Sequence, residues 1–188
     1  MISAAQSAKI KSIAYKCAIY TLALFVLAIA QTVFFSKINV LSATPDLLLA
    51  AIVLLCMKED HRVCSICAIA SGVFYCALGA AEHPVYIIFS FLCGYILWII
   101  AERSFGRGFK SYLALSALTF CIKGLFNLAY LSLFSSSFPL IRILVSIALP
   151  EIISSMVFCA VPYVIFSTLH KLINKKSSKR KEPRKNEF

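Results

Sequence analysis

The sequence predicts an all-α polytopic membrane protein with six transmembrane helices. Hydrophobic residues make up 61% of the 188 residues and charged residues only 14%, with a mean hydropathy of +0.87, which is too apolar for an ordinary soluble core. The apolar residues are grouped in long uncharged runs of the kind that cross a bilayer. Almost all of the 19 Lys and Arg residues lie between these runs or in the C-terminal tail, as expected for charges that set a membrane topology.

We divide the chain into an N-terminal cytoplasmic or interfacial segment (1–16), a six-helix transmembrane domain (17–169) and a basic cytoplasmic tail (170–188). The expected spans are, in order, 17–36, 46–57, 63–81, 85–101, 111–134 and 143–169. The first span is bounded by Lys16 and Lys37, the third ends at the Glu82-His83-Pro84 turn, and the fourth is closed by Glu102-Arg103. Proline ends the third span because it cannot continue a helix without losing a backbone hydrogen bond.

The second span is unusually short. Its sequence predicts a helix start with Thr44 as the N-cap, Pro45 at the first helical position, and Asp46 stabilised by the positive end of the helix dipole. The uncharged run that follows reaches only about 17 Å, whereas the hydrocarbon core is roughly 30 Å thick. The helix must therefore borrow polar flanking residues, thin the bilayer locally, or be shielded by its neighbours.

The distribution of Lys and Arg predicts that both termini are cytoplasmic. With six spans, 16 of the 19 basic residues fall on the side of the N-terminus. Only Lys37 and Arg142 fall on the other side, and Lys123 lies within a span. This asymmetry requires an even number of crossings, so the short second span must cross. We therefore expect a multi-pass membrane protein with both termini in the cytoplasm.

The net charge of +11 indicates anionic lipid rather than nucleic acid as the partner, because the charges gather in loops and the tail. The tail from Lys171 to Lys185 is expected to hold this face on anionic lipid and to be disordered beyond its first turn. The eight cysteines lie in or beside the apolar runs and are interpreted as small apolar side chains. Cys64 and Cys67 form a C-x-x-C, but no second pair completes a metal site, and no cofactor is expected.

Lys123 and Glu151 are the clearest candidates for chemistry, because ionisable groups inside spans are costly and usually face a partner. By helical rise, Lys123 lies about 18 Å below the end of the fifth span and Glu151 about 13 Å below the start of the sixth. Asn127, one turn from Lys123, shares its face. The cluster could bind a ligand or proton, lock the last hairpin as an ion pair, or contact another membrane protein. We favour the structural ion pair.

Three further features have structural interpretations. Asp46 is explained by the helix start alone, although it remains a candidate for an intramembrane interaction. His61 and Arg62, in the charged turn after the second span, could anchor the topology or dock a cytoplasmic partner. Gly72 and Gly94 are expected to allow close approach of helices.

The sequence contains none of the common catalytic motifs. There is no G-x-S-x-G, no H-E-x-x-H, no Walker A sequence and no pair of carboxylates at a plausible spacing. We therefore expect a protein that is not an enzyme, with no catalytic, metal or cofactor residues.

Several of these features together resemble the bacterial rod shape-determining protein MreD family. The matching features are P-D-L-L-L at 45–49, H-R-V at 61–63, Gly72 in the third span and G-Y at 94–95. The size, the six expected spans and the basic tail match as well. The chain departs from the family at Cys76, where an acidic residue is common, and at 80–84, where a glycine-rich turn is usual.

The resemblance implies a non-catalytic role in cell elongation and peptidoglycan synthesis. Such proteins work in the rod complex with MreC, with the actin-like MreB, and with a glycosyltransferase and a transpeptidase of cell-wall synthesis. It also implies a fold similar to the substrate-binding components of energy-coupling-factor transporters. The alternative function is therefore a vitamin-type substrate-binding subunit of a transporter.

Overall fold

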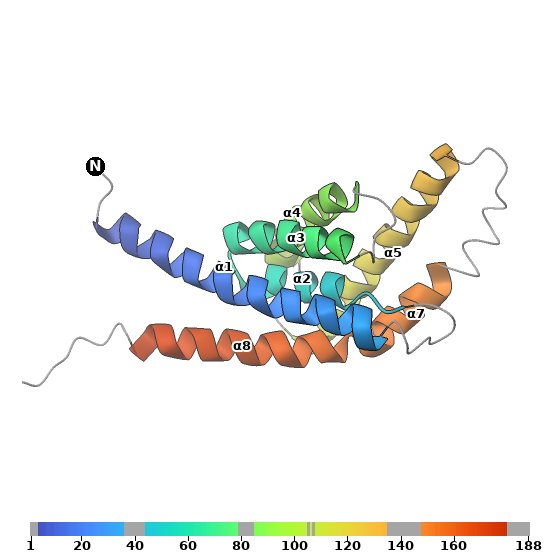
Figure 1. The fold of residues 1–188 in the computed structure, drawn as a ribbon. Coiled ribbons are helices and arrows are strands. Elements are labelled where there is room, and N and C mark those ends of the chain that lie inside the picture. Colours follow the sequence, from blue (N-terminus) through green and yellow to red (C-terminus); the bar gives the residue numbers. More distant parts are fainter. Residues whose placement is uncertain are drawn as a thin grey trace, which may run out of the picture.

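The computed structural model describes residues 4–35, 44–78, 85–104, 106, 108–134 and 148–179, and all of its elements are helical (Figure 1). In chain order they are α1 Ala4–Ala30, the π-helical turn η1 Gln31–Phe35, α2 Leu47–Lys58, α3 His61–Ala77, α4 Val85–Ser104, α5 Phe109–Phe134, α7 Leu149–Phe158 and α8 Ala160–Lys179. The prediction of an all-α protein is confirmed for this part of the chain.

Three helices are long and apolar enough to cross a membrane: Ile10–Phe34, which includes most of η1, Val85–Arg103 and Phe109–Leu133. Helices α7 and α8 are bent by 42° at Cys159 and together could form a fourth crossing. Helices α2 and α3 are apolar but shorter. The chain is thus a membrane-embedded helical protein with three or four candidate spanning helices among the described residues.

The element boundaries differ from the sequence prediction at both ends of the chain. Residues expected to form a separate interfacial segment are continuous with the first span, because α1 begins at Ala4 and runs to Ala30. Helix α8 extends to Lys179, well beyond the first turn after His170, through a stretch without glycine or proline. The Glu82-His83-Pro84 turn, the start of the expected sixth span and the tail from 180 lie outside the described residues.

The break between α7 and α8 has a local cause. Pro162 has no N–H group and its ring crowds the preceding turn, so the helix cannot continue straight through Cys159. Tyr112 of α5 donates its hydroxyl proton to the carbonyl oxygen of Cys159 at 3.0 Å, and it also lies 3.3 Å from the carbonyl of Ala50. The broken segment is therefore held against α2 and α5.

Helix α2 is the core of the molecule. Every residue from Leu47 to Met57 is buried, and α2 packs against α1, α3, α4, α5, α7 and α8 (Figure 1). Of the three ways in which a short helix could be accommodated, the structure uses shielding by neighbouring helices.

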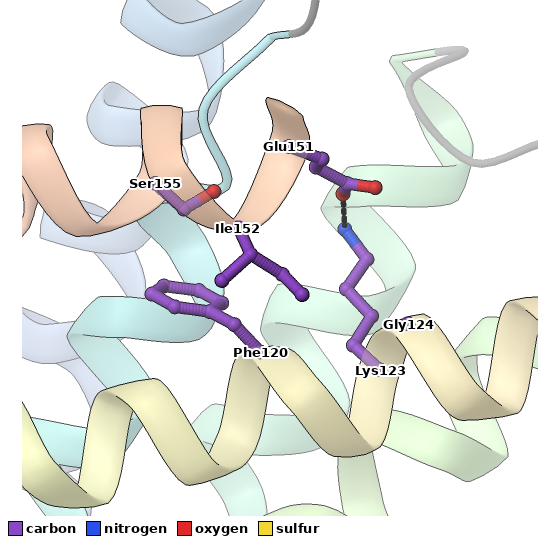
Figure 2. Close-up of a pocket in the computed structure, with 6 residues that line it drawn as sticks. All are labelled: Phe120, Lys123, Gly124, Glu151, Ile152 and Ser155. Atoms are coloured by element: carbon purple, nitrogen blue, oxygen red, sulfur yellow. Dashed lines mark hydrogen bonds and ion pairs between the residues drawn. The ribbon is translucent and has the colours of Figure 1, made fainter. Parts of the chain in front are cut away.

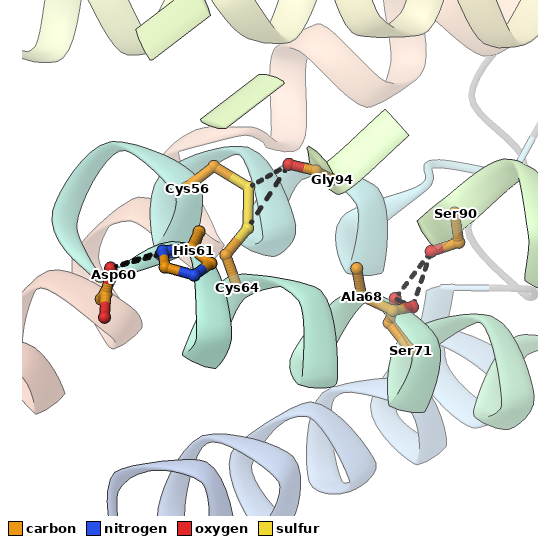
Figure 3. The surroundings of a disulfide bond; sticks show 8 residues. All are labelled: Cys56, Asp60, His61, Cys64, Ala68, Ser71, Ser90 and Gly94. Atoms are coloured by element: carbon orange, nitrogen blue, oxygen red, sulfur yellow. Dashed lines mark hydrogen bonds and ion pairs between the residues drawn. A yellow bond between two sulfur atoms is a disulfide. The ribbon is translucent and has the colours of Figure 1, made fainter. Parts of the chain in front are cut away.

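Helices α3 and α4 approach each other closely at two glycines. A Cβ atom built on Gly94 would lie 2.7 Å from the Cβ of Ala68, and one built on Gly72 would lie 2.9 Å from the Cα of Ile87. Beside them, the hydroxyl groups of Ser71 and Ser90 lie 3.1 Å apart and both donate to the carbonyl of Ala68 (Figure 3). The expectation of close helix packing at Gly72 and Gly94 agrees with this geometry.

Six of the eight cysteines lie in the buried core or in a disulfide, whereas Cys76 is half-buried and Cys121 is exposed. Cys17, Cys67, Cys93 and Cys159 are buried free thiols in the apolar core, as expected for small apolar side chains. Cys56 and Cys64, in contrast, are joined by a disulfide between α2 and α3 (Figure 3). This bond, which joins two cysteines eight residues apart, was not predicted from the sequence.

We predict that Gly94→Ala lowers the melting temperature of the purified protein in detergent. The added methyl group overlaps the Cβ of Ala68, and overpacking of this kind costs about 1–3 kcal/mol, more than the helix propensity that alanine gains. Gly108→Ala is the control, because no atom lies within 4 Å of the added Cβ there. Adding Ala68→Gly should restore part of the stability. Equal melting temperatures for the Gly94 and Gly108 variants would contradict the close contact.

Candidate functional site

Asp46 caps the first turn of α2. Its Oδ1 accepts a hydrogen bond from the backbone N–H of Leu49 at 3.0 Å, and its side chain is only 1% exposed. The prediction that Thr44 is the N-cap and Pro45 the first helical residue is therefore wrong: the helix begins two residues later, at Leu47. A side-chain carboxylate at this position satisfies a free N–H group and also interacts favourably with the helix dipole.

The remaining free N–H groups of this helix end are satisfied by other segments. The N–H of Asp46 donates to Ser155 Oγ of α7 at 2.9 Å. The N–H groups of Leu47 and Leu48 donate to Gln31 Oε1 of η1 at 2.9 and 3.2 Å. All four N–H groups that a helix start leaves unpaired thus have partners inside the protein, which an apolar environment demands.

Lys123 of α5 joins two carboxylates. Its Nζ lies 2.6 Å from Asp46 Oδ2 and 2.6 Å from Glu151 Oε1 of α7. Figure 2 shows the lysine side chain reaching from α5 across to Glu151. The Lys123 side chain is 5% exposed and that of Glu151 is 22% exposed, so Asp46 is the more deeply buried of the two partners.

Two tyrosines complete the surroundings of the ammonium group. The hydroxyl of Tyr86 donates to Asp46 Oδ2 at 2.8 Å, and Lys123 Nζ lies 3.4 Å from the hydroxyl of Tyr75. The Lys123 Nζ lies 5.1 and 5.4 Å from the centroids of the Tyr75 and Tyr86 rings, within the range of cation–π attraction. The two rings stack at 4.5 Å. We call Asp46, Lys123, Glu151, Tyr75 and Tyr86 the charge cluster.

The charge cluster matches part of the sequence prediction. The structure brings Lys123 and Glu151 together, as their matched depths indicated. Asp46 is a second ion-pair partner of Lys123. From the sequence alone, Asp46 is explained by the helix start and remains a candidate for an intramembrane interaction, but this partner is not identified. Asn127 is half-buried and makes no hydrogen bond to the residues of the cluster.

Sequence reasoning did not find Gln31, Ser155, Tyr75 and Tyr86. Gln31 carried a signal, because it is the one amide within the first apolar run. The other three are ordinary in apolar spans, and only the fold shows that they face Asp46 or Lys123.

A second group of polar residues lies at the other end of α2, around Glu59. Glu59 Oε2 pairs with Lys16 of α1 at 2.7 Å, and Oε1 accepts a hydrogen bond from Tyr20 at 2.7 Å. The Nδ1 atom of His170 on α8 lies 2.8 Å from the same Oε1 atom, and Asn174 contacts the other ring nitrogen at 3.0 Å. We call Glu59, Lys16, Tyr20 and His170 the turn cluster. It joins α1, the α2–α3 turn and α8.

The carboxylate of Glu59 is held in its charged form. Burial by itself would raise its pKa, but the hydrogen bonds from His170, Lys16 and Tyr20 outweigh that effect and lower the pKa to about 2. A negative charge at the C-terminal end of a helix is disfavoured by the helix dipole. The lysine and histidine therefore compensate for an unfavourable position as well as for burial.

His61 and Arg62, the predicted turn residues, lie at the start of α3. Asp60 caps this helix, with its Oδ1 accepting from the N–H of His61 at 2.9 Å, and the His61 Nδ1 atom lies 2.8 Å from the same oxygen. The His61 ring packs 5.2 Å from that of Trp98. Arg62 is exposed. Neither residue contributes to the charge cluster or the turn cluster.

The charge cluster borders a shallow recess between α5 and α7, lined by Phe120, Lys123, Gly124, Glu151, Ile152 and Ser155 (Figure 2). This recess has no enclosed space, even for a water-sized molecule. No group of three or more His, Cys, Asp and Glu side chains arranged to hold a metal occurs within the described ranges. The arrangement is suited to joining helices through ion pairs, with two carboxylates around one ammonium group.

We predict that Lys123→Met is the most destabilising single change in the charge cluster, because it leaves two carboxylates without their cation. Breaking a buried ion pair from one side costs about 3–5 kcal/mol. Adding Asp46→Asn should recover much of this loss, since asparagine still caps the helix and the more buried charge is removed. Adding Glu151→Gln should recover less, because Glu151 is already partly exposed.

The measurement is the melting temperature of each purified variant in the same detergent, together with its abundance in membranes. Equal recovery in the two double variants would contradict the greater importance of Asp46. Simply additive losses would mean that the three residues do not form one cluster.

We predict that Glu59 stabilises the fold above about pH 4.5 and that this contribution is lost as the pH falls toward about 2. The sign follows from a folded-state pKa that lies below the ordinary value of 4.5: protonation in acid favours the unfolded chain. The melting temperatures of the wild type and Glu59→Gln should therefore differ near neutral pH and converge in acid. Asp60→Asn is the control, because Asp60 is exposed and asparagine still caps α3. A difference that is independent of pH would exclude this role of the carboxylate.

Comparisons of the chain with protein-family models, with curated proteins and with solved structures gave no match. What can be inferred about function therefore comes from the two clusters, from the membrane-embedded helical fold and from the sequence motifs.

Proposed function

We propose that this protein is a non-catalytic membrane component of the bacterial cell-elongation machinery. In this role it would help to form and maintain cell shape by organising an MreC-like protein, an MreB-like actin homologue and the glycosyltransferase and transpeptidase of peptidoglycan synthesis. The proposal is based on the sequence resemblance to the MreD family. The observation that supports it best is the charge cluster, in which Asp46 of the P-D-L-L-L motif fixes the buried start of α2.

The charge cluster favours a structural role over ligand binding. The Lys123 ammonium group is paired with two carboxylates and faces two aromatic rings, so its charge needs no substrate for compensation. The recess beside it has no room for a vitamin-sized molecule. A vitamin-binding transport subunit is therefore the less favoured alternative, and the loops at 37–45 and 135–142 that would have to close over a vitamin are short.

The proposed topology has six crossings with both termini in the cytoplasm of a bacterial cell membrane. It requires α2 and α3 to count as crossings although they are short, which their apolar composition and the burial of α2 allow. Anionic lipid would contact the basic side, and nucleic acid is not expected as a partner.

We predict that Thr44 and Glu102 face opposite sides of the membrane. Both positions are exposed, and they lie at opposite ends of the proposed crossings. Single cysteines at these positions, in a background without the native cysteines, should be labelled by a membrane-impermeant reagent from opposite sides. Labelling of both from one side would exclude the six-span topology with cytoplasmic termini.

We predict that depletion of the protein turns rod-shaped cells into round ones and that added vitamins do not restore the rod shape. The full-length protein, purified gently from membranes, should carry an MreC-like protein or cell-wall synthases and no vitamin. Complementation with Gly108→Ala should restore the shape, whereas Lys123→Met should not, because it damages the charge cluster. Co-purification of a vitamin, or rescue of growth by one, would favour the transport subunit instead.

A further inference from the structure

A group of polar and aromatic residues that belongs to neither cluster lies on α8, beside the C-terminal end of α2. Tyr163, Ser167 and Lys171 follow one another at intervals of four residues, about 6 Å apart along the helix. They bring an aromatic ring, a hydroxyl and an ammonium group together on neighbouring turns. Phe109 of α5, 41% exposed, packs edge-on against the Tyr163 ring at 4.8 Å.

Lys58, the last residue of α2, contacts Ser167 and Tyr163 of this group. Its Nζ donates to Ser167 Oγ at 2.6 Å and lies 5.5 Å from the centroid of the Tyr163 ring. Burial lowers the pKa of the Lys58 ammonium group, and the positive charge of Lys171 lowers it further. Lys58 is thus held on Ser167 where α2 packs against α8, and Lys171 lies one helical turn beyond Ser167 on the same side of α8.

Neither charge is neutralised within the described part of the chain. No carboxylate there lies within 4 Å of Lys58 or Lys171, in contrast to Lys16 and Lys123, which are both paired. An ammonium group has three N–H donors, and only one from Lys58 is used by Ser167. The Ser167 hydroxyl, which accepts from Lys58, still has its own proton to donate. Unused donors and positive charge therefore gather at one place.

The neighbouring surface is apolar. Val164 of α8, the residue after Tyr163, is largely exposed, and Phe109 of α5 is partly exposed. A molecule that satisfies the whole site would carry several anionic oxygen atoms at one end and a hydrocarbon chain at the other. This chemistry fits an anionic phospholipid, whose phosphate would lie at the basic end and whose acyl chain would follow the apolar side chains.

We propose that Lys58, Ser167 and Lys171 bind the phosphate of one anionic phospholipid, with Tyr163 and Phe109 beside its glycerol and acyl region. This site is separate from the general attraction of the basic tail to a charged membrane. It does not depend on the proposed role in cell elongation.

The test measures the melting temperature of the full-length protein in detergent as phosphatidylglycerol is added. We expect stabilisation by phosphatidylglycerol and not by phosphatidylcholine. The double variant Lys58→Gln/Lys171→Gln should need about 25-fold more lipid for the same shift, and each single variant about fivefold more, since a basic residue near anionic lipid contributes about 1 kcal/mol. The single variants keep the test valid if the double variant does not fold.

The matched control is Arg62→Gln/Arg103→Gln, which removes two exposed positive charges, one at the start of α3 and one near the end of α4. It should respond to phosphatidylglycerol like the wild type, as should Lys58→Arg/Lys171→Arg. An equal loss in the control would show that only net charge matters and would overturn the site. An equal shift with inorganic phosphate would assign the site to a free anion, and a shift with an acidic peptide but not with lipid would assign it to a protein partner. Either result would overturn the lipid assignment.

Discussion

The length of α2 is the constraint on which the rest of the structure depends. Twelve residues give about 18 Å of helix, so its ends cannot both reach the surfaces of a hydrocarbon layer roughly 30 Å thick. Free backbone groups and charges at such ends are costly unless the protein supplies partners. The structure supplies them at both ends and covers the helix between them with six other helices.

The two ends of α2 present unequal electrostatic problems. At the start, Asp46 is favoured by the helix dipole, and Lys123 forms ion pairs with both Asp46 and Glu151. At the end, Glu59 is disfavoured by the dipole and takes a lysine from α1 and a histidine from α8. The first group joins α2 to α3, α4, α5 and α7, and the second joins it to α1 and α8. Each carboxylate therefore links helices that are far apart in the sequence.

The helical fold class could be predicted from the sequence, because composition and long uncharged runs can be read without knowing how the helices pack. The Lys123–Glu151 pair could be predicted as well, since the two residues lie on consecutive spans and their depths can be counted from the intervening loop. Counting of this kind cannot identify Asp46 as a partner of Lys123. The two residues are 77 positions apart, and their helices, α2 and α5, do not follow each other in the chain.

Glu59 and the cap of α2 show a second reason for the limits of prediction. A glutamate beside lysine, aspartate and arginine in a turn is indistinguishable in sequence from a solvated residue, and only the packing of α1 and α8 buries it. Thr44 and Asp46 are both good N-cap residues. The choice between them depends on Ser155 and Gln31, which receive the N–H groups of a helix that begins at Leu47.

The hydrogen bond from the N–H of Asp46 to Ser155 has a consequence for biogenesis. During synthesis α2 emerges 109 residues before its acceptor on α7, and its partner Lys123 is also made much later. The nascent helix therefore enters the membrane with its polar start incomplete, and only Gln31 of the earlier chain is already present to receive its N–H groups. Helix α2 can complete its packing only after the last third of the polypeptide has been made. A chain interrupted before α7 would therefore expose this polar end to lipid or to the quality-control proteases of the membrane.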